Sequence, residues 1–247
     1  MSQSPNQPTS IQVMSRMFSL LDTLAQGQEA VSLKYISAQT GLHPSTAHRI
    51  LNDLAAGRYV ERAGPGSYRL GLRLLELGNL VRGRLDLRDE ASTPMQDLHR
   101  LLSSPVSLFS RQEQDAVCIT RTGQERHGIS LQRVPHQRVA LTDSIPGRVM
   151  LVKESGPQLH HLCQQSGQRP EVVQLDVQQA RQSGVLIGSE GASNNQVVTA
   201  APIYNDEGTV IGALAVSSAP GQEQADAIKD AAQRISVQMG WQAPTPT

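Results

Sequence analysis

The segment from Lys34 to Leu54 constrains this chain more than any other, because it encodes two short helices joined by a tight turn. On a wheel of about 3.6 residues per turn, its second half separates into an apolar side and a hydrogen-bonding side. Gly41 suits the sharp turn, and Pro44 suits the first position of the second helix, where a missing amide hydrogen leaves no partner unsatisfied. The pattern predicts a helix-turn-helix whose second helix reads DNA.

The two sides of this second helix differ in chemistry. The apolar side can pack on a domain core, and the polar side is free to enter a groove. Its polar residue types hydrogen-bond base edges and phosphates. An ordinary amphipathic helix pair with a solvated polar side is the alternative interpretation. The apolar positions are Ala47, Ile50, Leu51 and Leu54, and the predicted DNA-contacting positions are Ser45, Thr46, His48, Arg49 and Asn52.

Two short strand patterns directly after the reading helix predict a β-hairpin. They cover residues 59–63 and 67–70, and the Gly-Pro-Gly run between them is typical of a turn. A hairpin in this place is the wing of a winged helix. The wing residues expected to reach phosphates or a minor groove are Arg62, Ser67 and Arg69.

Charge is distributed unevenly along a chain that is neutral overall, with 22 basic and 22 acidic side chains among 247 residues. Residues 1–85 contain nine basic and five acidic side chains, a net charge of +4. Residues 86–247 contain 13 basic and 17 acidic ones, a net charge of −4. This asymmetry fits a nucleic-acid-binding module joined to a domain that avoids DNA, and the length suits two modest domains.

Neither a membrane-spanning apolar run nor the basic and apolar regions of a signal peptide occur in the sequence. We therefore expect a cytoplasmic protein with no membrane partner. Cys118 and Cys163 are the only cysteines, and Cys118 lies in an apolar strand pattern where a reduced thiol packs as a small hydrophobe. We expect no disulfide.

Hydrophobic periodicity predicts further helices and strands along the chain. A first helix is expected at about 12–26, and another at 95–102 has Pro94 in its first turn or at a kink. Asp176 is expected to cap a helix that stops at Gly184. The other expected strands are 106–110, 116–122, 129–134, 138–142, 196–204 and 209–217, and the other expected helices are 145–152, 159–163 and 222–239.

These elements predict an α+β chain of two parts. Strands with helices grouped around them argue for a sensor-like domain with a central antiparallel sheet. A helical link that bends at its glycines joins it to the winged helix. The expected boundaries are a disordered tail at 1–10, the winged helix-turn-helix domain at 11–71, the helical link at 72–90 and the effector-binding domain at 91–247.

Several motifs of this chain resemble those of one known family. The run from Val13 to Gly78, with SRMFSLLDTL, STAHRIL and GSYRLGLRLLELG, resembles the winged-helix domain of IclR-type transcriptional regulators. Further on, TDSIPGRVML resembles a diverged threonine-alanine-x-glycine-lysine segment, and TAAPIYNDEGTVIGALAVSS is similar to the family's last two strands. The resemblance implies a homodimer or homotetramer that binds palindromic operator DNA and a small-molecule effector in a GAF-like C-terminal domain.

The resemblance also places an effector pocket between the sheet and its covering loops. Family members that hold small carboxylates line this pocket with hydroxyls, a thiol and an acid. Here the acidic position falls near Gly188 or Ser189. The cysteine falls on Val198, and one of two last-strand serines falls on Ala215. A less polar pocket follows, suited to an organic acid with an apolar or aromatic body. The implied ligand-binding residues are Thr142, Ser144, Ile145, Gly147, Gly188, Ser189, Val198, Ala215 and Ser217.

Backbone amides at the start of the helix expected at 145–152 suggest an anion site. Ser144, Ile145 and Gly147 can form an amide nest, although Ser144 can equally serve only as a helix cap. Arg148 and Arg133 can pair with a carboxylate, but exposed arginines are usually just solvated.

The sequence gives little support for a metal site or for an enzyme. His160, His161 and Cys163 are zinc-ligand types, but adjacent helical residues point about 100° apart and do not easily share one tetrahedral ion. Cys118 with a histidine is the only candidate for thiol redox chemistry. We expect no cofactor, no metal and no enzymatic activity. The alternatives to a ligand-responsive regulator are a constitutive DNA-binding factor whose C-terminal domain only mediates oligomerisation, and an enzyme with an incidental winged helix.

Overall fold

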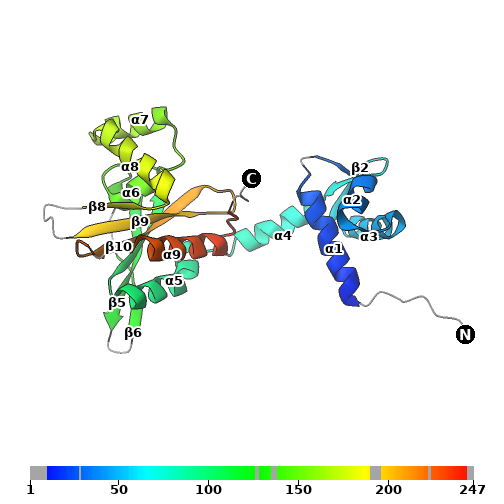
Figure 1. Ribbon diagram of the computed structural model, residues 1–247, viewed down its shortest axis with the longest axis horizontal. Helices are drawn as coiled ribbons and strands as arrows, with labels where there is room; N and C mark the ends of the chain where they lie inside the picture. Colours follow the sequence, from blue (N-terminus) through cyan, green and yellow to red (C-terminus); the bar gives the residue numbers. More distant parts are fainter. Residues whose placement is uncertain are drawn as a thin grey trace, which may run out of the picture. The chain divides into compact units, whose positions relative to one another are not determined.

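The computed structural model divides the chain into two compact units, residues 1–84 and residues 85–247 (Figure 1). Most of the tail expected at 1–10 lies outside the described residues. The residues that the structure describes are 10–27, 29–125, 128–134, 138–189, 196–221 and 224–243.

The first unit is a winged helix with one apolar core. Its elements are α1 (Ser10–Ala25), β1 (Val31–Ser32), α2 (Leu33–Thr40), α3 (Pro44–Ala56), β2 (Val60–Gly64), β3 (Ser67–Leu70) and α4 (Leu72–Arg82). The three strands form a sheet of order β1-β3-β2, so the expected hairpin gains a third, two-residue strand. Leu20, Ile36 and Leu51 are fully buried where α1, α2 and α3 pack together.

Local sequence explains where α2 begins and ends. The Ser32 hydroxyl accepts a hydrogen bond from the Tyr35 backbone N at 3.2 Å and caps the start of the helix. Gly41 ends it with a φ of +66°, the left-handed conformation that favours glycine. The turn between the two helices is therefore fixed by residue type, and α3 starts three residues later with Pro44 in its first turn.

The second unit is an α+β domain built on an antiparallel sheet. Its helices are α5 (Leu87–Leu102), α6 (Ile145–Val149), α7 (Gly156–Ser166), α8 (Pro170–Ser183) and α9 (Ala225–Gln238). Its strands are β4 (Val106–Gln112), β5 (Asp115–Glu125), β6 (Gly128–Gln132), β7 (Arg138–Ala140), β8 (Leu186–Ser189), β9 (Val197–Tyr204) and β10 (Val210–Ser218). The sheet order is β6-β5-β4-β10-β9-β8, and β7 also pairs with β5.

Helices cover both faces of this sheet (Figure 1). α5 and α9 pack on one face and α6 to α8 lie on the other, so each face has its own hydrophobic cluster. Strand alternation distributes β9 between the clusters: Val198 and Ala200 belong to the α6 side, and Ala201 and Ile203 belong to the α5 and α9 side. The α+β fold class expected from the sequence is confirmed.

Two expected helix starts are wrong. α5 begins at Leu87, because Asp86 caps it by accepting hydrogen bonds from Arg88 N and Asp89 N, and Pro94 lies in its interior. Burial along this helix outweighs the hydrogen bond lost at the proline. α8 begins at Pro170, so Asp176 is an interior residue and not a cap.

Other expected bounds also shift, and two strands were not anticipated. The helix expected at 145–152 ends at Val149, and turns follow it. Strands β1 and β8 have only two and four residues, too few to show an alternating pattern. They exist because longer neighbouring strands offer them an edge.

Candidate nucleic-acid interface and effector site

Helix α3 presents its polar side outward because its apolar side is fixed in the core. Ala47 and Leu51 are fully buried. At the start of the helix, His43 Nδ1 accepts a hydrogen bond from the Ser45 backbone N at 3.4 Å and lies 2.8 Å from Ser45 Oγ. His43 therefore caps α3. The sequence pattern did not reveal this role, because histidine is not among the preferred cap residues.

The polar side of α3 holds the five residues predicted to contact DNA. Ser45, His48 and Arg49 are exposed, and Thr46 and Asn52 are half-buried. Among the described residues Arg49 has neither a hydrogen bond nor an ion pair. Its guanidinium therefore keeps all five N–H donors for a partner such as a guanine edge or a phosphate.

A chain of hydrogen bonds joins α3 to the wing. Arg62 Nη2, on β2, donates to Asn52 Oδ1 at 2.7 Å. The amide nitrogen of Asn52 in turn lies 3.3 Å from His48 Nδ1, one helical turn earlier. These three side chains orient one another, so the structure presents them as one positioned polar unit.

The two wing arginines lie on opposite faces of the hairpin. Arg62 is in register with Tyr68, whose ring is buried, and Arg69 is in register with Glu61. Arg69 Nη2 lies 2.9 Å from Glu61 Oε2, and Glu61 also accepts from the Leu72 backbone N at 3.3 Å. The hydrogen bond from Arg69 is the main cause that lowers the pKa of Glu61. The charge of Arg69 is thus paired, whereas Arg62 bonds only to a neutral amide among the described residues.

Ser67, the remaining wing candidate, is half-buried at the start of β3. It is in register with Ser32 of β1 and with Gly64 of β2. Next to it, Gly66 has a φ of +68°, which the wing turn requires.

In the second unit, three adjacent strands bring predicted pocket residues together. Gly188 of β8 is in register with Val198 of β9, and Val198 is in register with Ser217 of β10. Ala215 lies two residues before Ser217 and shares its face of the sheet. Ser189 ends β8 and is exposed.

Helix α6 covers this patch and closes it. The Ser144 hydroxyl caps the helix by accepting from the Gly147 backbone N at 3.1 Å. Ile145 packs directly on Gly188, where its side chain leaves no room for a Cβ. Val198 and Ala215 are 8% and 4% exposed, which shows that the patch is packed as part of the core. Apart from Ser217 the patch is apolar, and the side chain of Ile145 packs on it.

The polar groups beside α6 are engaged with the protein itself. Arg148 Nε donates to the Thr142 carbonyl O at 2.7 Å, and Arg148 Nη1 lies 2.6 Å from Asp176 Oδ2. The Thr142 hydroxyl donates to Ser166 Oγ at 2.7 Å. Arg148 thus fixes the loop before α6 to α8, while Arg133 is exposed to solvent.

Two family models match the chain in the order of its two units. The IclR helix-turn-helix domain matches residues 13–64, and the bacterial transcriptional regulator IclR C-terminal domain matches residues 80–237, more than half of the chain. The chain belongs to the IclR family. It is a DNA-binding transcriptional regulator with an effector-binding C-terminal domain, and the resemblance read from its motifs is confirmed.

Curated relatives and solved structures agree with this IclR assignment. The HTH-type transcriptional regulator XynR of Escherichia coli K12 is 26% identical over 84% of this chain and 86% of its own length. KdgR of the same strain is 25% identical over 95% of both chains. The crystal structure of Pseudomonas aeruginosa HmgR superimposes with a TM-score of 0.75 at 20% identity, over 94% of this chain and 99% of HmgR. XynR and KdgR are named as transcriptional regulators and not as enzymes.

An IclR homologue from Microbacterium hydrocarbonoxydans, solved with 4-hydroxybenzoate, has the same fold. Its TM-score is 0.52 at 20% identity, over 92% of this chain and 98% of that one.

The two cysteines of this IclR protein are buried, and the histidine pair before Cys163 is exposed. Cys118 and Cys163 are free thiols in the α6-side cluster, and burial raises the pKa of both. His160 and His161 are exposed whereas Cys163 is buried, so these three side chains diverge. Within the described ranges, no three His, Cys, Asp or Glu side chains gather as a metal site, and no helix is long and apolar enough to cross a membrane.

Proposed function

We propose that this IclR-family regulator works in the cytoplasm as a homodimer or homotetramer, binds an inverted-repeat operator and senses a small organic acid with an apolar or aromatic body. The operator contacts are assigned to the polar side of α3 and to the wing. The effector is assigned to the patch between α6 and strands β8 to β10.

Assembly is supported by the surface of the first unit. α1 exposes Met14 and Phe18, and α4 exposes Leu75 and Leu80, each by about half of its surface or more. Apolar side chains gathered on two helices of one small unit favour burial against a second copy. A single winged helix also offers little surface for a selective site, whereas two copies read two half-sites related by the two-fold axis.

Light scattering and operator binding test the assembly. Phe18→Glu and Leu75→Glu should each shift the protein toward monomer and weaken binding to an inverted repeat. Binding to one isolated half-site should change little. A wild-type monomer that binds one half-site with full affinity would contradict the dimeric reading.

We call the group of Gly188, Val198, Ala215 and Ser217 beneath Ile145 the α6 patch. Its mainly apolar lining is the observation that carries the effector proposal. Val198, Ala215 and Gly188 present no polar groups that an apolar ligand would leave unpaired. The Ser144 hydroxyl, which accepts from the Gly147 backbone N and keeps its own hydrogen, is the polar group that can donate to a carboxylate. Because Ile145 fills the space above Gly188, a ligand here must displace Ile145, which makes α6 the element that responds. The 4-hydroxybenzoate of the Microbacterium homologue belongs to the proposed ligand class.

A thermal-shift screen of aromatic and aliphatic acids identifies a ligand, and calorimetry then tests its site. A ligand at 100 times its dissociation constant should add about 2.7 kcal/mol to the free energy of unfolding. Val198→Cys combined with Ala215→Ser should weaken an aromatic acid and leave ligand-free DNA affinity unchanged. An unaltered dissociation constant in the double variant would remove these residues from the site.

A constitutive DNA-binding factor is the second candidate, and the closed packing of Ile145 on Gly188 favours it. In that case the C-terminal domain only mediates oligomerisation. The screen would then find no acid that raises the unfolding temperature or alters operator affinity.

A further inference from the structure

The strand β9 is only half covered by its short neighbour. β8 pairs with Val197 to Ala200, and Ala201 to Tyr204 have no strand partner on that side among the described residues. Pro202 has no N–H to offer there, and the Tyr204 backbone N donates to Ser236 Oγ at 3.0 Å. The last four residues of β9 are therefore poor partners for another strand. The side of β9 that β8 leaves uncovered is open to a small molecule.

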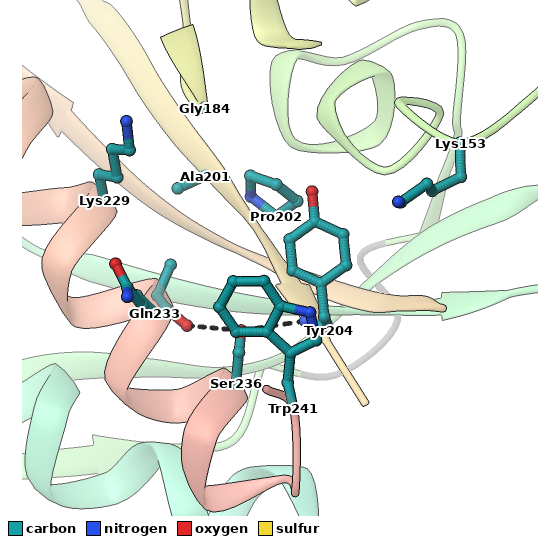
Figure 2. A pocket seen from close by; sticks show the side chains of 10 residues that line it. Lys153, Gly184, Ala201, Pro202, Tyr204, Lys229, Gln233, Ser236 and Trp241 are labelled. Atoms are coloured by element: carbon teal, nitrogen blue, oxygen red, sulfur yellow. Dashed lines mark hydrogen bonds between the residues drawn. The ribbon is translucent and has the colours of Figure 1, made fainter. Parts of the chain in front are cut away.

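A cavity of about 360 Å³ lies along this flank, between β9, the stretch of α9 from Lys229 to Ser236 and Gly184 at the end of α8 (Figure 2). This volume lies within the range of small-molecule sites. It does not involve the α6 patch. Its lining residues are Lys153, Gly184, Ala201, Pro202, Tyr204, Lys229, Ala232, Gln233, Ser236 and Trp241.

The cavity collects two of the three lysines in the whole chain. Figure 2 shows Lys153 and Lys229 on opposite sides of it. Lys153 Nζ lies 5.8 Å from the centre of the Tyr204 ring and has no ion pair among the described residues. Lys229 Nζ donates to the Ser183 carbonyl O at 2.9 Å, which leaves further N–H donors. None of the described residues that line the cavity is acidic, so its charge is positive.

Aromatic and apolar groups form the rest of the wall. Tyr204 stacks on Trp241 with 5.2 Å between ring centres and 20° between planes. Pro202 and Ala232 add apolar surface. Among the described residues the Tyr204 hydroxyl has no hydrogen bond, and burial raises its pKa, so it stays a protonated donor. In Figure 2 this hydroxyl lies between Pro202 and Lys153.

We propose that this cavity is a second ligand site, separate from the α6 patch, which binds an aromatic carboxylate. The carboxylate accepts from the Lys153 ammonium and the Tyr204 hydroxyl, and the ring packs on Pro202, Ala232 and Trp241. The second lysine, Lys229, adds positive potential at the far side. A flat anion suits these walls, because charge-assisted bonds fix one end and apolar contacts fix the other.

The intact protein provides its own reporter, since Trp241 is the only tryptophan in the chain. We expect 2-naphthoate to shift the single indole N–H resonance of Trp241 and to bind in calorimetry. The uncharged 2-naphthamide should bind about tenfold more weakly, because it loses the charge-assisted bonds. Lys153→Met should raise the dissociation constant of 2-naphthoate by about tenfold, and Tyr204→Phe by a smaller factor.

Matched controls separate this site from the rest of the molecule. Lys34→Met removes the third lysine and should change neither binding nor the resonance. Val198→Cys with Ala215→Ser should leave the Trp241 response intact, even if it weakens an effector at α6. The proposal is overturned if 2-naphthoate does not bind, if it binds without moving the Trp241 resonance, or if a correctly folded Lys153→Met protein binds it as tightly as wild type.

Discussion

The two units of this regulator present the side chains proposed for binding in opposite ways. On the winged helix, Arg49 and His48 are exposed, and Arg62 is already positioned by Asn52. In the C-terminal domain, Ile145 and Val198 are buried and packed. DNA is a large charged surface that exposed polar side chains can bind directly, whereas an apolar ligand needs a site shielded from water. Substitutions on the exposed side of α3 should therefore change DNA affinity alone. Substitutions in the patch under α6 should change both ligand affinity and the stability of the domain.

The largest expected effect comes from a substitution in the apolar core beneath α3. Leu51→Ala removes a fully buried side chain and should lower the free energy of unfolding of the first unit by about 2–5 kcal/mol. Calorimetry should show that this unit unfolds at a lower temperature than in the wild type, while the unfolding temperature of the C-terminal domain is unchanged. Leu214→Ala, equally buried in the second unit, is the matched control and should reverse the pattern. A single shared transition in both variants would show that the units do not unfold separately.

The next effect concerns the free guanidinium on α3. Arg49→Ala should weaken operator binding by about 1–3 kcal/mol if the side chain reads a guanine, with unchanged circular dichroism. Fluorescence anisotropy on operator DNA measures it, and wild-type affinity in the variant would remove Arg49 from the interface. Arg62→Ala should weaken binding to all sequences and flatten the salt dependence.

A smaller effect is expected where α6 meets the sheet. Gly188→Ala adds a methyl group that must displace the Ile145 side chain. The free energy of unfolding should fall by only about 1 kcal/mol, because the Ile145 side chain can shift. Effector affinity should change while DNA affinity without ligand stays the same. Ile187→Val, at the exposed position before Gly188 and outside the predicted site, is the control for both measurements. If Gly188→Ala left the stability and the effector affinity unchanged, Ile145 would not be what closes the site.

The smallest effect concerns Arg69, whose charge is paired with Glu61. Because the folded-state pKa of Glu61 is lowered, the pair is complete above the ordinary glutamate pKa and is lost as the pH falls through the lowered value. An NMR titration of the Glu61 carboxyl should show this low midpoint, and Arg69→Ala should raise it.

Arg69→Ala should also weaken DNA binding less than Arg62→Ala, since Arg69 must leave Glu61 to reach a phosphate. Equal losses in the two variants would show that the pair opens freely on DNA.

The sequence by itself determined the winged helix, since its residue-type signals are local. Gly41 permits the turn, Pro44 suits the start of α3, and Ala47 and Leu51 recur at helical spacing. The other strands of the second unit, except the short β8, were predictable for the same reason, because alternation and turn residues act over a few positions.

Only the tertiary structure decided which side chains meet. The pairing of Arg69 with Glu61, the capping of α3 by His43 and the packing of Ile145 on Gly188 depend on register and on close contact. The positive cavity is the clearest case, because Lys153 and Lys229 are 76 positions apart in sequence and line one cavity only through the packing of the domain. Local patterns specify elements, but long-range contacts between elements arise from the packing of the whole domain.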